Sequence, residues 1–158
     1  MPVYKILDMD KPDEAGVLRQ KCKEVKEITP SIIKLLDNLV DTMRANRGVG
    51  LAAPQIGVSK RVVVVDTGEG VVELINPVIS DPRGQVLDTE GCLSAPGLLC
   101  EVPRAQKVRV KAWDREGREV GYRVEGFAAR VVQHEVDHLD GILFTDRAVA
   151  VKRPRKEA

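Results

Sequence analysis

The chain has only two histidines, and they lie close together near its C-terminal end. His134 and His138 fall in the segment VVQHEVDHLDG, residues 131–141. On a helix, residues four apart point about 40° from each other, so both imidazoles share one face. Two ring nitrogens placed in this way can bind one metal ion, and Glu135 between them can act on a metal-bound water. The segment therefore predicts a metal site.

Two core histidines bonded to backbone carbonyl groups are the alternative interpretation. The metal is favoured because the complete H-E-x-x-H pattern is present on a predicted helix. A ligating histidine usually donates its second N–H to a carboxylate or a carbonyl, and Asp137 is the expected acceptor. A solvent-exposed Asp137 is the other possibility.

A third protein ligand is needed, because catalytic sites of this kind have three protein ligands and one open position. Downstream, Asp140 and Asp146 offer carboxylate oxygens. Upstream, Cys92 in the segment DTEGCLSAPG offers a thiolate, which is the favoured ligand. A cysteine in a loop can also be a small buried residue without a function.

A glycine-rich segment, RGVGLAAPQIG at residues 47–57, contains the spacing of a dinucleotide-binding fingerprint. The context argues against that function, because the segment follows a predicted helix and Pro54 and Gly57 would break the helix that must follow. Its small residues instead let the backbone approach a ligand closely, and Gln55 adds an amide donor. A tight turn between a helix and a strand is the alternative.

The elements that must position these residues follow from hydrophobic periodicity. Residues 27–48 predict an amphipathic helix with Thr29 as N-cap, Pro30 in the first turn and Gly48 at the end. A second helix runs from about Gly126 to Asp140. Predicted strands cover 61–66, 71–79, 107–113 and 118–125, the last two forming an antiparallel hairpin. Because helices and strands do not alternate regularly, the expected class is α+β.

Composition narrows the possible functions. The 158 residues fit a single domain, 1–158, and the net charge of +1 gives no reason to expect specific nucleic-acid binding or a membrane partner. Three cysteines, Cys22, Cys92 and Cys100, do not suggest a disulfide framework. No signal peptide is visible, so we expect a soluble cytoplasmic protein.

Three segments together resemble the signature motifs of the peptide deformylase family. They are GVGLAAPQ at 48–55, EGCLS at 90–94 and QHEVDH at 133–138, in the order that the family has them. The resemblance implies an α+β fold in which antiparallel sheets pack around a central helix bearing the H-E-x-x-H motif, with an amphipathic helix nearer the N-terminus.

The resemblance also implies roles for individual residues. Cys92, His134 and His138 would bind one divalent metal ion, commonly Fe(II), with Zn(II) or another divalent ion as alternatives. Glu135 would be the general acid/base for a metal-bound water nucleophile. Gln55 and the backbone N–H of Leu93 would stabilise the oxyanion. The backbone of Gly50 would help to hold the substrate, in a pocket whose expected apolar residues are Val49, Phe127 and Val131.

The implied reaction is removal of the formyl group from the N-terminal formylmethionine of polypeptides leaving the ribosome. A metallopeptidase of the H-E-x-x-H type that cleaves ordinary peptide bonds is the second hypothesis, and a non-enzymatic fold with a structural metal is the third. Cys92 as a ligand favours the first over the second. Three ligands with a free Glu135 argue against the third, since structural sites usually have four.

Two further expectations concern the ion pairs and the C-terminal segment. Glu90 is expected to pair with Arg104, with a solvent-facing Glu90 as the alternative. Leu99 stands near a position where some family members have a basic residue. Residues 147–158 are expected to form a flexible basic tail whose charged side chains can make transient ribosome contacts: Lys152, Arg153, Arg155 and Lys156.

Overall fold

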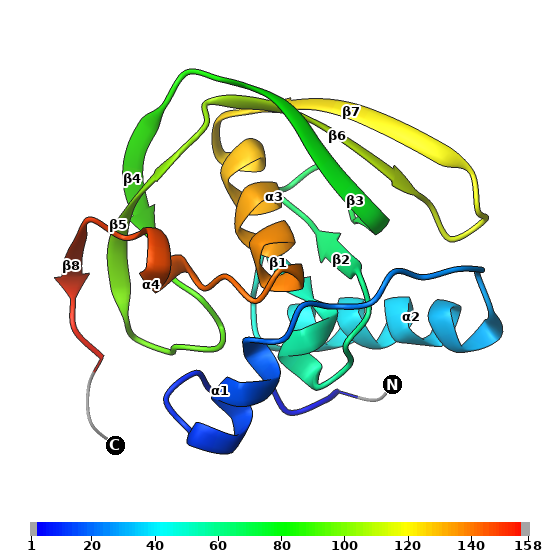
Figure 1. Cartoon of the computed structure of the whole chain (residues 1–158), viewed down its shortest axis with the longest axis horizontal. Coiled ribbons are helices and arrows are strands. Elements are labelled where there is room, and N and C mark those ends of the chain that lie inside the picture. Colours follow the sequence, from blue (N-terminus) through cyan, green and yellow to red (C-terminus); the bar gives the residue numbers. More distant parts are fainter. Residues whose placement is uncertain (1–2, 156–158) are drawn as a thin grey trace.

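Two antiparallel β-sheets surround a central helix in the computed structural model, which describes residues 3–155 (Figure 1). The α+β class predicted from the sequence is confirmed. The five-stranded sheet has the order β1-β2-β3-β6-β7, with β1 (Gly50–Ala52), β2 (Val62–Val65), β3 (Val72–Arg83), β6 (Lys107–Trp113) and β7 (Glu119–Glu125). The three-stranded sheet has the order β4-β5-β8, with β4 (Val86–Glu90), β5 (Leu99–Arg104) and β8 (Ala150–Arg153).

Four α-helices and one short 3-10 helix complete the described part of the chain. They are α1 (Pro12–Leu18), α2 (Pro30–Ala45), η1 (Ala53–Ile56), α3 (Gly126–Leu139) and α4 (Phe144–Arg147). None of these described helices is long and apolar enough to cross a membrane.

Helix α2 begins where the sequence predicts. The Thr29 Oγ1 atom accepts a hydrogen bond from the Ile32 N–H at 3.4 Å, and Pro30 occupies the first turn. The end of the helix differs from the prediction, because Arg47, with φ 54°, adopts the left-handed conformation expected of Gly48. Gly48 instead allows close packing of the backbone against Leu93, since a Cβ atom at position 48 would lie 2.7 Å from Leu93 Cδ1.

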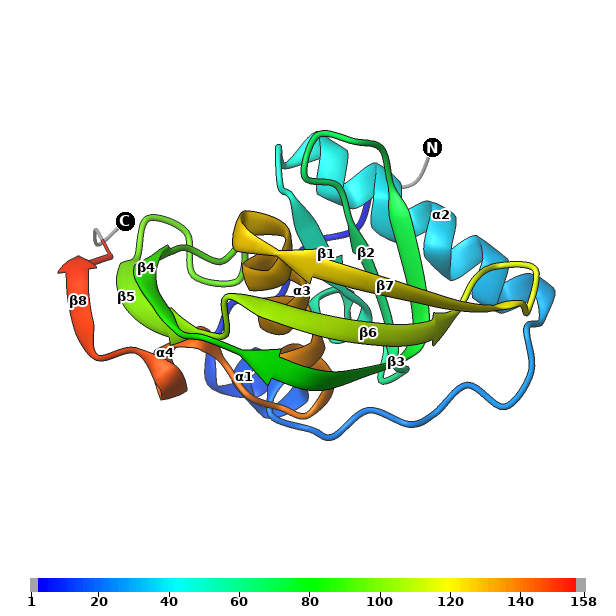
Figure 2. The same ribbon diagram turned by 90° about the horizontal axis from the view of Figure 1, so that it is seen from above.

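Helix α3 packs against the five-stranded sheet through an aliphatic core. In Figures 1 and 2 it runs beneath the long strands β3, β6 and β7 and beside the small sheet. Burying each aliphatic side chain of this core contributes about 1.5–3 kcal/mol. Because α3 has neighbours on several sides, both its apolar and its polar side chains are buried: Ala129, Arg130, Val131, Val132, His134, Glu135, Val136, His138 and Leu139.

The predicted hairpin is present as β6 and β7. Val108, Val110 and Ala112 of β6 are buried and alternate with exposed residues. The Asp114 N–H donates to the Arg118 carbonyl at 2.9 Å, and Gly117 takes a φ of 78° in the turn. Strand β3 is longer than the predicted 71–79. It continues to Arg83, which pairs with Lys107 of β6, and its register with β6 shifts at two places along the way.

The described part of the C-terminal segment, for which a flexible tail from residue 147 is predicted, contains regular structure. Arg147 ends helix α4, and Ala150–Arg153 form β8, whose backbone pairs with β5. The side chains of this strand are exposed, so their composition gives no sign of it. Backbone pairing and an ion pair from Arg155 to Asp8 hold the segment instead. Lys156 lies outside the described residues.

Candidate metal centre

Cys92, His134 and His138, which we call the metal triad, come together as the sequence predicts. One ligand atom of each lies within 4.8 Å of the others. The loop after β4 brings Cys92, and one face of α3 brings the two histidines, whose ring centroids are 5.2 Å apart. Asp140 and Asp146, the alternative ligands, instead form ion pairs with Arg61 and Arg19.

The spacing of the metal triad fits a metal ion. Cys92 Sγ and His138 Nε2 are 3.5 Å apart. Metal–sulfur and metal–nitrogen bonds of about 2.3 and 2.0 Å at a tetrahedral angle give a separation of about 3.5 Å. The donor set of one thiolate and two imidazoles suits Zn(II), Fe(II) and related divalent ions.

Glu90 fixes the tautomer of His134. His134 Nδ1 lies 2.8 Å from Glu90 Oε1. Burial raises the pKa of Glu90, but hydrogen bonds from His134 and Arg104 outweigh it and lower the pKa to about 2. Glu90 is therefore a carboxylate that only accepts, so Nδ1 carries the proton. With the proton on Nδ1, the neutral form of this imidazole presents the lone pair of Nε2 to a metal.

The charges around the metal triad favour a cation at its centre. Burial lowers the pKa of His134, but Cys92 and Glu90 raise it, and the net pKa lies well above the usual value. Burial, and then the charge on His134, lower the pKa of His138 well below the usual value. A divalent ion provides a positive charge among these groups while both imidazoles stay neutral.

Glu135 lies in the same pocket without belonging to the metal triad. Burial raises the pKa of its carboxyl to about 7. Its Oε1 atom is buried and has no hydrogen-bond partner among the described residues. The other oxygen faces Gly50, since a Cβ on Gly50 would lie 2.7 Å from Oε2. Such a carboxyl group can accept and release a proton near neutral pH.

Gln55 points its amide nitrogen toward the metal triad. The Ala52 N–H donates to Gln55 Oε1 at 3.0 Å, which fixes the orientation of the buried amide. Its Nε2 group lies 3.1 Å from Ser94 Oγ and 3.7 Å from Cys92 Sγ. The neighbouring Leu93 N–H donates to no other described residue. Two N–H donors therefore lie beside Cys92, a suitable arrangement for a developing oxyanion.

Comparison with known proteins identifies the family. A family model described as Polypeptide deformylase matches residues 3–154. The peptide deformylase of Carboxydothermus hydrogenoformans is 55% identical over 153 residues, which cover 97% of this chain and 98% of that protein. The chain belongs to the peptide deformylase family. It is a metal-dependent amide hydrolase that removes the formyl group from N-terminal formylmethionine.

Solved deformylase structures share the fold. The structure from Thermotoga maritima matches with a TM-score of 0.88 at 40% identity, covering 94% of this chain and 99% of that one. The structure from Synechococcus elongatus in complex with actinonin matches with a TM-score of 0.87 at 36% identity, covering 94% and 80%.

A cleft of about 480 Å³ opens onto the deformylase metal triad. The residues expected to bind substrate all line it, together with Gln55 and Leu93: Val49, Gly50, Phe127 and Val131. Val131 is buried, whereas Val49 and Phe127 are 41% and 59% exposed. Phe127 lies two turns before His134 on α3, where the helix face that carries Val131 reaches the cleft and the solvent.

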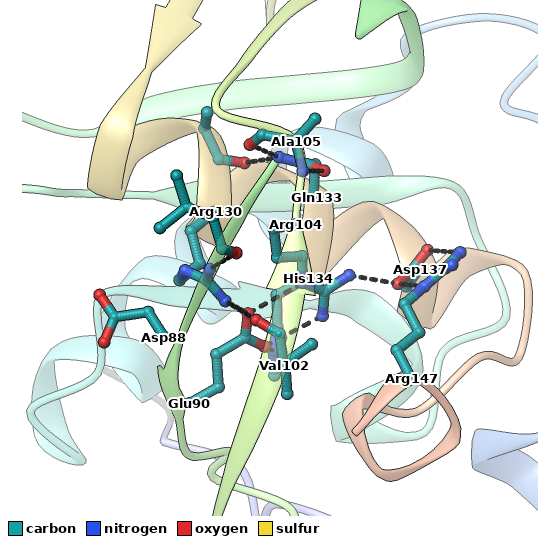
Figure 3. Close-up of polar contacts among 12 residues, drawn as sticks. Asp88, Glu90, Val102, Arg104, Ala105, Arg130, Gln133, His134, Asp137 and Arg147 are labelled. Atoms are coloured by element: carbon teal, nitrogen blue, oxygen red, sulfur yellow. Dashed lines mark hydrogen bonds and ion pairs between the residues drawn. The ribbon is translucent and has the colours of Figure 1, made fainter. Parts of the chain in front are cut away.

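Asp137 does not bond to a ligand histidine, so that prediction is wrong. Its carboxylate accepts instead from Arg104 Nη1 and Arg147 Nε, both at 2.6 Å (Figure 3). The predicted pair of Glu90 with Arg104 is confirmed, at 2.8 and 3.0 Å. Sequence reasoning missed Arg130, which also donates to Glu90. An arginine one turn before His134 on a buried helix face is the signal that could have revealed it.

Proposed function

We propose that deformylation by this chain uses Glu135 as both general base and general acid. Glu135 takes a proton from the attacking water and returns it to the nitrogen of the leaving amine. The observation that supports this role best is the buried Oε1 atom, which has no partner among the described residues although it lies beside the metal triad. A carboxyl group with a pKa of about 7 can perform both proton transfers at neutral pH.

Cys92, His134 and His138 are the residues that would hold the metal ion. We propose Fe(II) as its identity, with Zn(II) or another divalent ion as alternatives. When bound, such an ion polarises the formyl carbonyl group and lowers the pKa of a coordinated water toward neutrality. Glu90 supports this by keeping the proton of His134 on Nδ1.

Gln55 and the Leu93 backbone N–H are proposed to stabilise the negative charge that develops on the formyl oxygen. Both donors lie beside Cys92, and the Gln55 amide is already oriented by the Ala52 N–H. Pre-oriented donors need no rearrangement when charge develops, so they stabilise the transition state more than the substrate.

The cleft suits a formylmethionyl end. A formyl carbon carries only hydrogen, so it fits where Gly48 and Gly50 bring the backbone close to Leu93 and Glu135. The backbone of Gly50 would hold the peptide. Val49, Phe127 and Val131 offer an apolar surface for the methionine side chain.

The proposed substrates are newly made polypeptides in the cytoplasm. Transient ribosome contact would use the basic side chains near the C-terminal end of the described chain. Two of these side chains already have partners in the protein, because Lys152 contacts Thr89 and Arg155 contacts Asp8. Arg153, which is exposed on β8, is therefore the more available cation for RNA phosphates.

The role of Glu135 is tested with the substitution Glu135→Ala. General acid–base catalysis contributes about 10²–10⁴-fold, so turnover of a formylmethionyl peptide should fall by at least that order. Metal content should stay at one ion per chain, because the metal triad is intact. Actinonin, which the Synechococcus elongatus enzyme binds, should still bind. Near-normal turnover with metal retained would exclude the proposed role.

The metallopeptidase alternative is tested with paired substrates. N-formyl and N-acetyl versions of one methionyl peptide differ by a methyl group on the acyl carbon. We expect rapid release of formate and much slower release of acetate, because that methyl would meet the backbone at Gly48 and Gly50. Equal rates, or cleavage of internal peptide bonds, would favour a metallopeptidase.

A further inference from the structure

Glu90 is the acceptor at the centre of a buried polar cluster behind the metal triad. We call Glu90, Arg104, Arg130 and His134 the Glu90 cluster. Oε1 accepts from His134 Nδ1 at 2.8 Å and from Arg104 Nη2 at 3.0 Å, and Oε2 accepts from Arg104 Nε at 2.8 Å and Arg130 Nη1 at 2.5 Å (Figure 3). The cluster is buried, since the four side chains are 3–8% exposed.

The two arginines of the Glu90 cluster differ in their other partners. Arg104 is shared with a second carboxylate, Asp137, which also binds the half-exposed Arg147. Arg130 has Glu90 as its one carboxylate among the described residues. Two further N–H groups of Arg130 donate to backbone carbonyl groups, Val102 O and Val86 O, both at 2.8 Å. Among the described carboxylates, Arg130 therefore binds Glu90 alone, whereas Arg104 binds both Glu90 and Asp137.

The location of Arg130 connects the Glu90 cluster to the metal-bearing helix. Arg130 and His134 are one turn apart on α3, whereas Glu90 ends β4 and the two carbonyl acceptors belong to β4 and β5. One guanidinium group thus fixes α3, two strands and the Glu90 carboxylate relative to one another. Any rotation of the carboxylate would also move the acceptor of the His134 N–H.

We infer, on the basis of the function proposed above, that Arg130 is a positioning residue for the metal. It holds the Glu90 carboxylate so that Glu90 orients His134, with its free Nε2 directed at the ion. Residues that support a metal ligand in this way typically change metal affinity by about 10–100-fold when replaced.

The charge and the geometry of Arg130 have opposite effects on metal binding. A guanidinium group repels a divalent cation, so its charge alone weakens binding. Its hydrogen bonds, in contrast, favour binding by fixing His134. Removal of the side chain therefore tightens binding if charge dominates and weakens it if positioning dominates.

The test uses Arg130→Met and Arg130→Lys in the full chain. The dissociation constant for Zn(II) is measured by competition with a chromophoric chelator, well below the melting temperature of each protein. We expect Arg130→Met to raise the constant at least about tenfold, with Arg130→Lys between it and the parent. A constant for Arg130→Met within threefold of the parent's, or lower, would overturn the inference. If Arg130→Met does not fold, Arg130→Lys decides alone: a constant above the parent's supports the inference, and a constant equal to or below the parent's overturns it.

A control separates positioning from general destabilisation. Arg115 is likewise an arginine paired with carboxylates, here Glu73 and Asp37, but it lies outside the Glu90 cluster. Arg115→Met should lower the melting temperature and leave Zn(II) affinity unchanged. The absorption spectrum of the Co(II) form should change in Arg130→Lys and not in Arg115→Met. A parent protein without a metal site would instead refute the proposed function, and Glu135→Ala tests its catalytic part separately.

Discussion

At the scale of single residues, Gly50 leaves the space that the Glu135 carboxylate occupies. A Cβ atom at position 50 would lie 2.7 Å from Glu135 Oε2, 2.8 Å from Glu135 Cγ and 3.0 Å from Val131 Cγ1. Contacts this short force a neighbour to move. Because Val131 is packed in the core, the movement falls mainly on the Glu135 side chain.

We therefore predict that Gly50→Ala lowers kcat on a formylmethionyl peptide by about 10²-fold or more, because a misplaced general base loses most of its effect. Metal content should not change. Turnover and metal content are measured on the same preparation.

Gly16→Ala is the matched control for this substitution. Gly16 lies in α1 and has no atom within 4 Å of its would-be Cβ. Alanine is the better helix former, so this variant should keep full activity and normal or slightly raised stability. Full activity in Gly50→Ala would show that the Glu135 side chain can relax without loss of function.

At the scale of elements, Asn76 fastens the segment before α2 to strand β3. Its Oδ1 accepts from the Val25 N–H at 2.8 Å, and its Nδ2 donates to the Val25 carbonyl at 2.7 Å. Asn76 also has a φ of 53°, which asparagine tolerates better than most residues. The Asn76 side chain thus satisfies both backbone hydrogen-bonding groups of Val25, as a neighbouring strand would.

We predict that Asn76→Ala lowers the free energy of unfolding by about 2–5 kcal/mol. Two hydrogen bonds contribute about 0.5–1.5 kcal/mol each, and the left-handed backbone costs alanine about 1–2 kcal/mol. The measurement is urea denaturation of the metal-loaded protein.

Asn76→Gly separates the two contributions. Glycine loses the same hydrogen bonds but accepts the positive φ, so it should be more stable than the alanine variant by about 1 kcal/mol. Equal stabilities of the two variants would mean that the backbone conformation at residue 76 changes.

At the scale of the whole molecule, an ion pair joins the two ends of the described chain. Arg155 bonds to Asp8, and its Nη1 group lies 2.7 Å from Asp10 Oδ2. The hydrogen bond from Arg155 lowers the pKa of the Asp8 carboxyl to about 2. Because the unfolded chain has a higher Asp8 pKa, the pair stabilises the fold once Asp8 is ionised, and this stabilisation is lost as the pH falls toward 2.

We predict that Asp8→Asn is less stable than the parent at pH 5–7, and that the difference shrinks by pH 3. Asparagine keeps the acceptor for the Asp10 N–H, so the substitution removes mainly the charge. The free energies of unfolding of the two proteins are compared by urea denaturation at each pH. If the difference in unfolding free energy between the two proteins stays constant down to pH 3, the stabilisation does not come from the ionised carboxylate of Asp8.

The local features of this protein could be predicted from its sequence. Helix α2, the β6–β7 hairpin and α3 follow from periodicity, capping and turn residues, which act within a few positions along the chain. The H-E-x-x-H spacing brings His134 and His138 to one helix face for the same reason. Cys92 and Gln55 were predicted from their residue types and from the motifs, because their distance from His134 along the chain gives no geometric relation to it.

Contacts between groups that are distant along the chain depend on how the elements pack. Glu90, rather than Asp137, accepts the His134 N–H because β4 ends beside α3, whereas Asp137 faces Arg104 and Arg147. Strand β8 forms through backbone pairing with β5, which exposed side chains do not encode. The partners of Arg130 likewise lie on two strands that periodicity did not reveal. Local sequence patterns specify elements, but the pairing of buried charges depends on how those elements pack together.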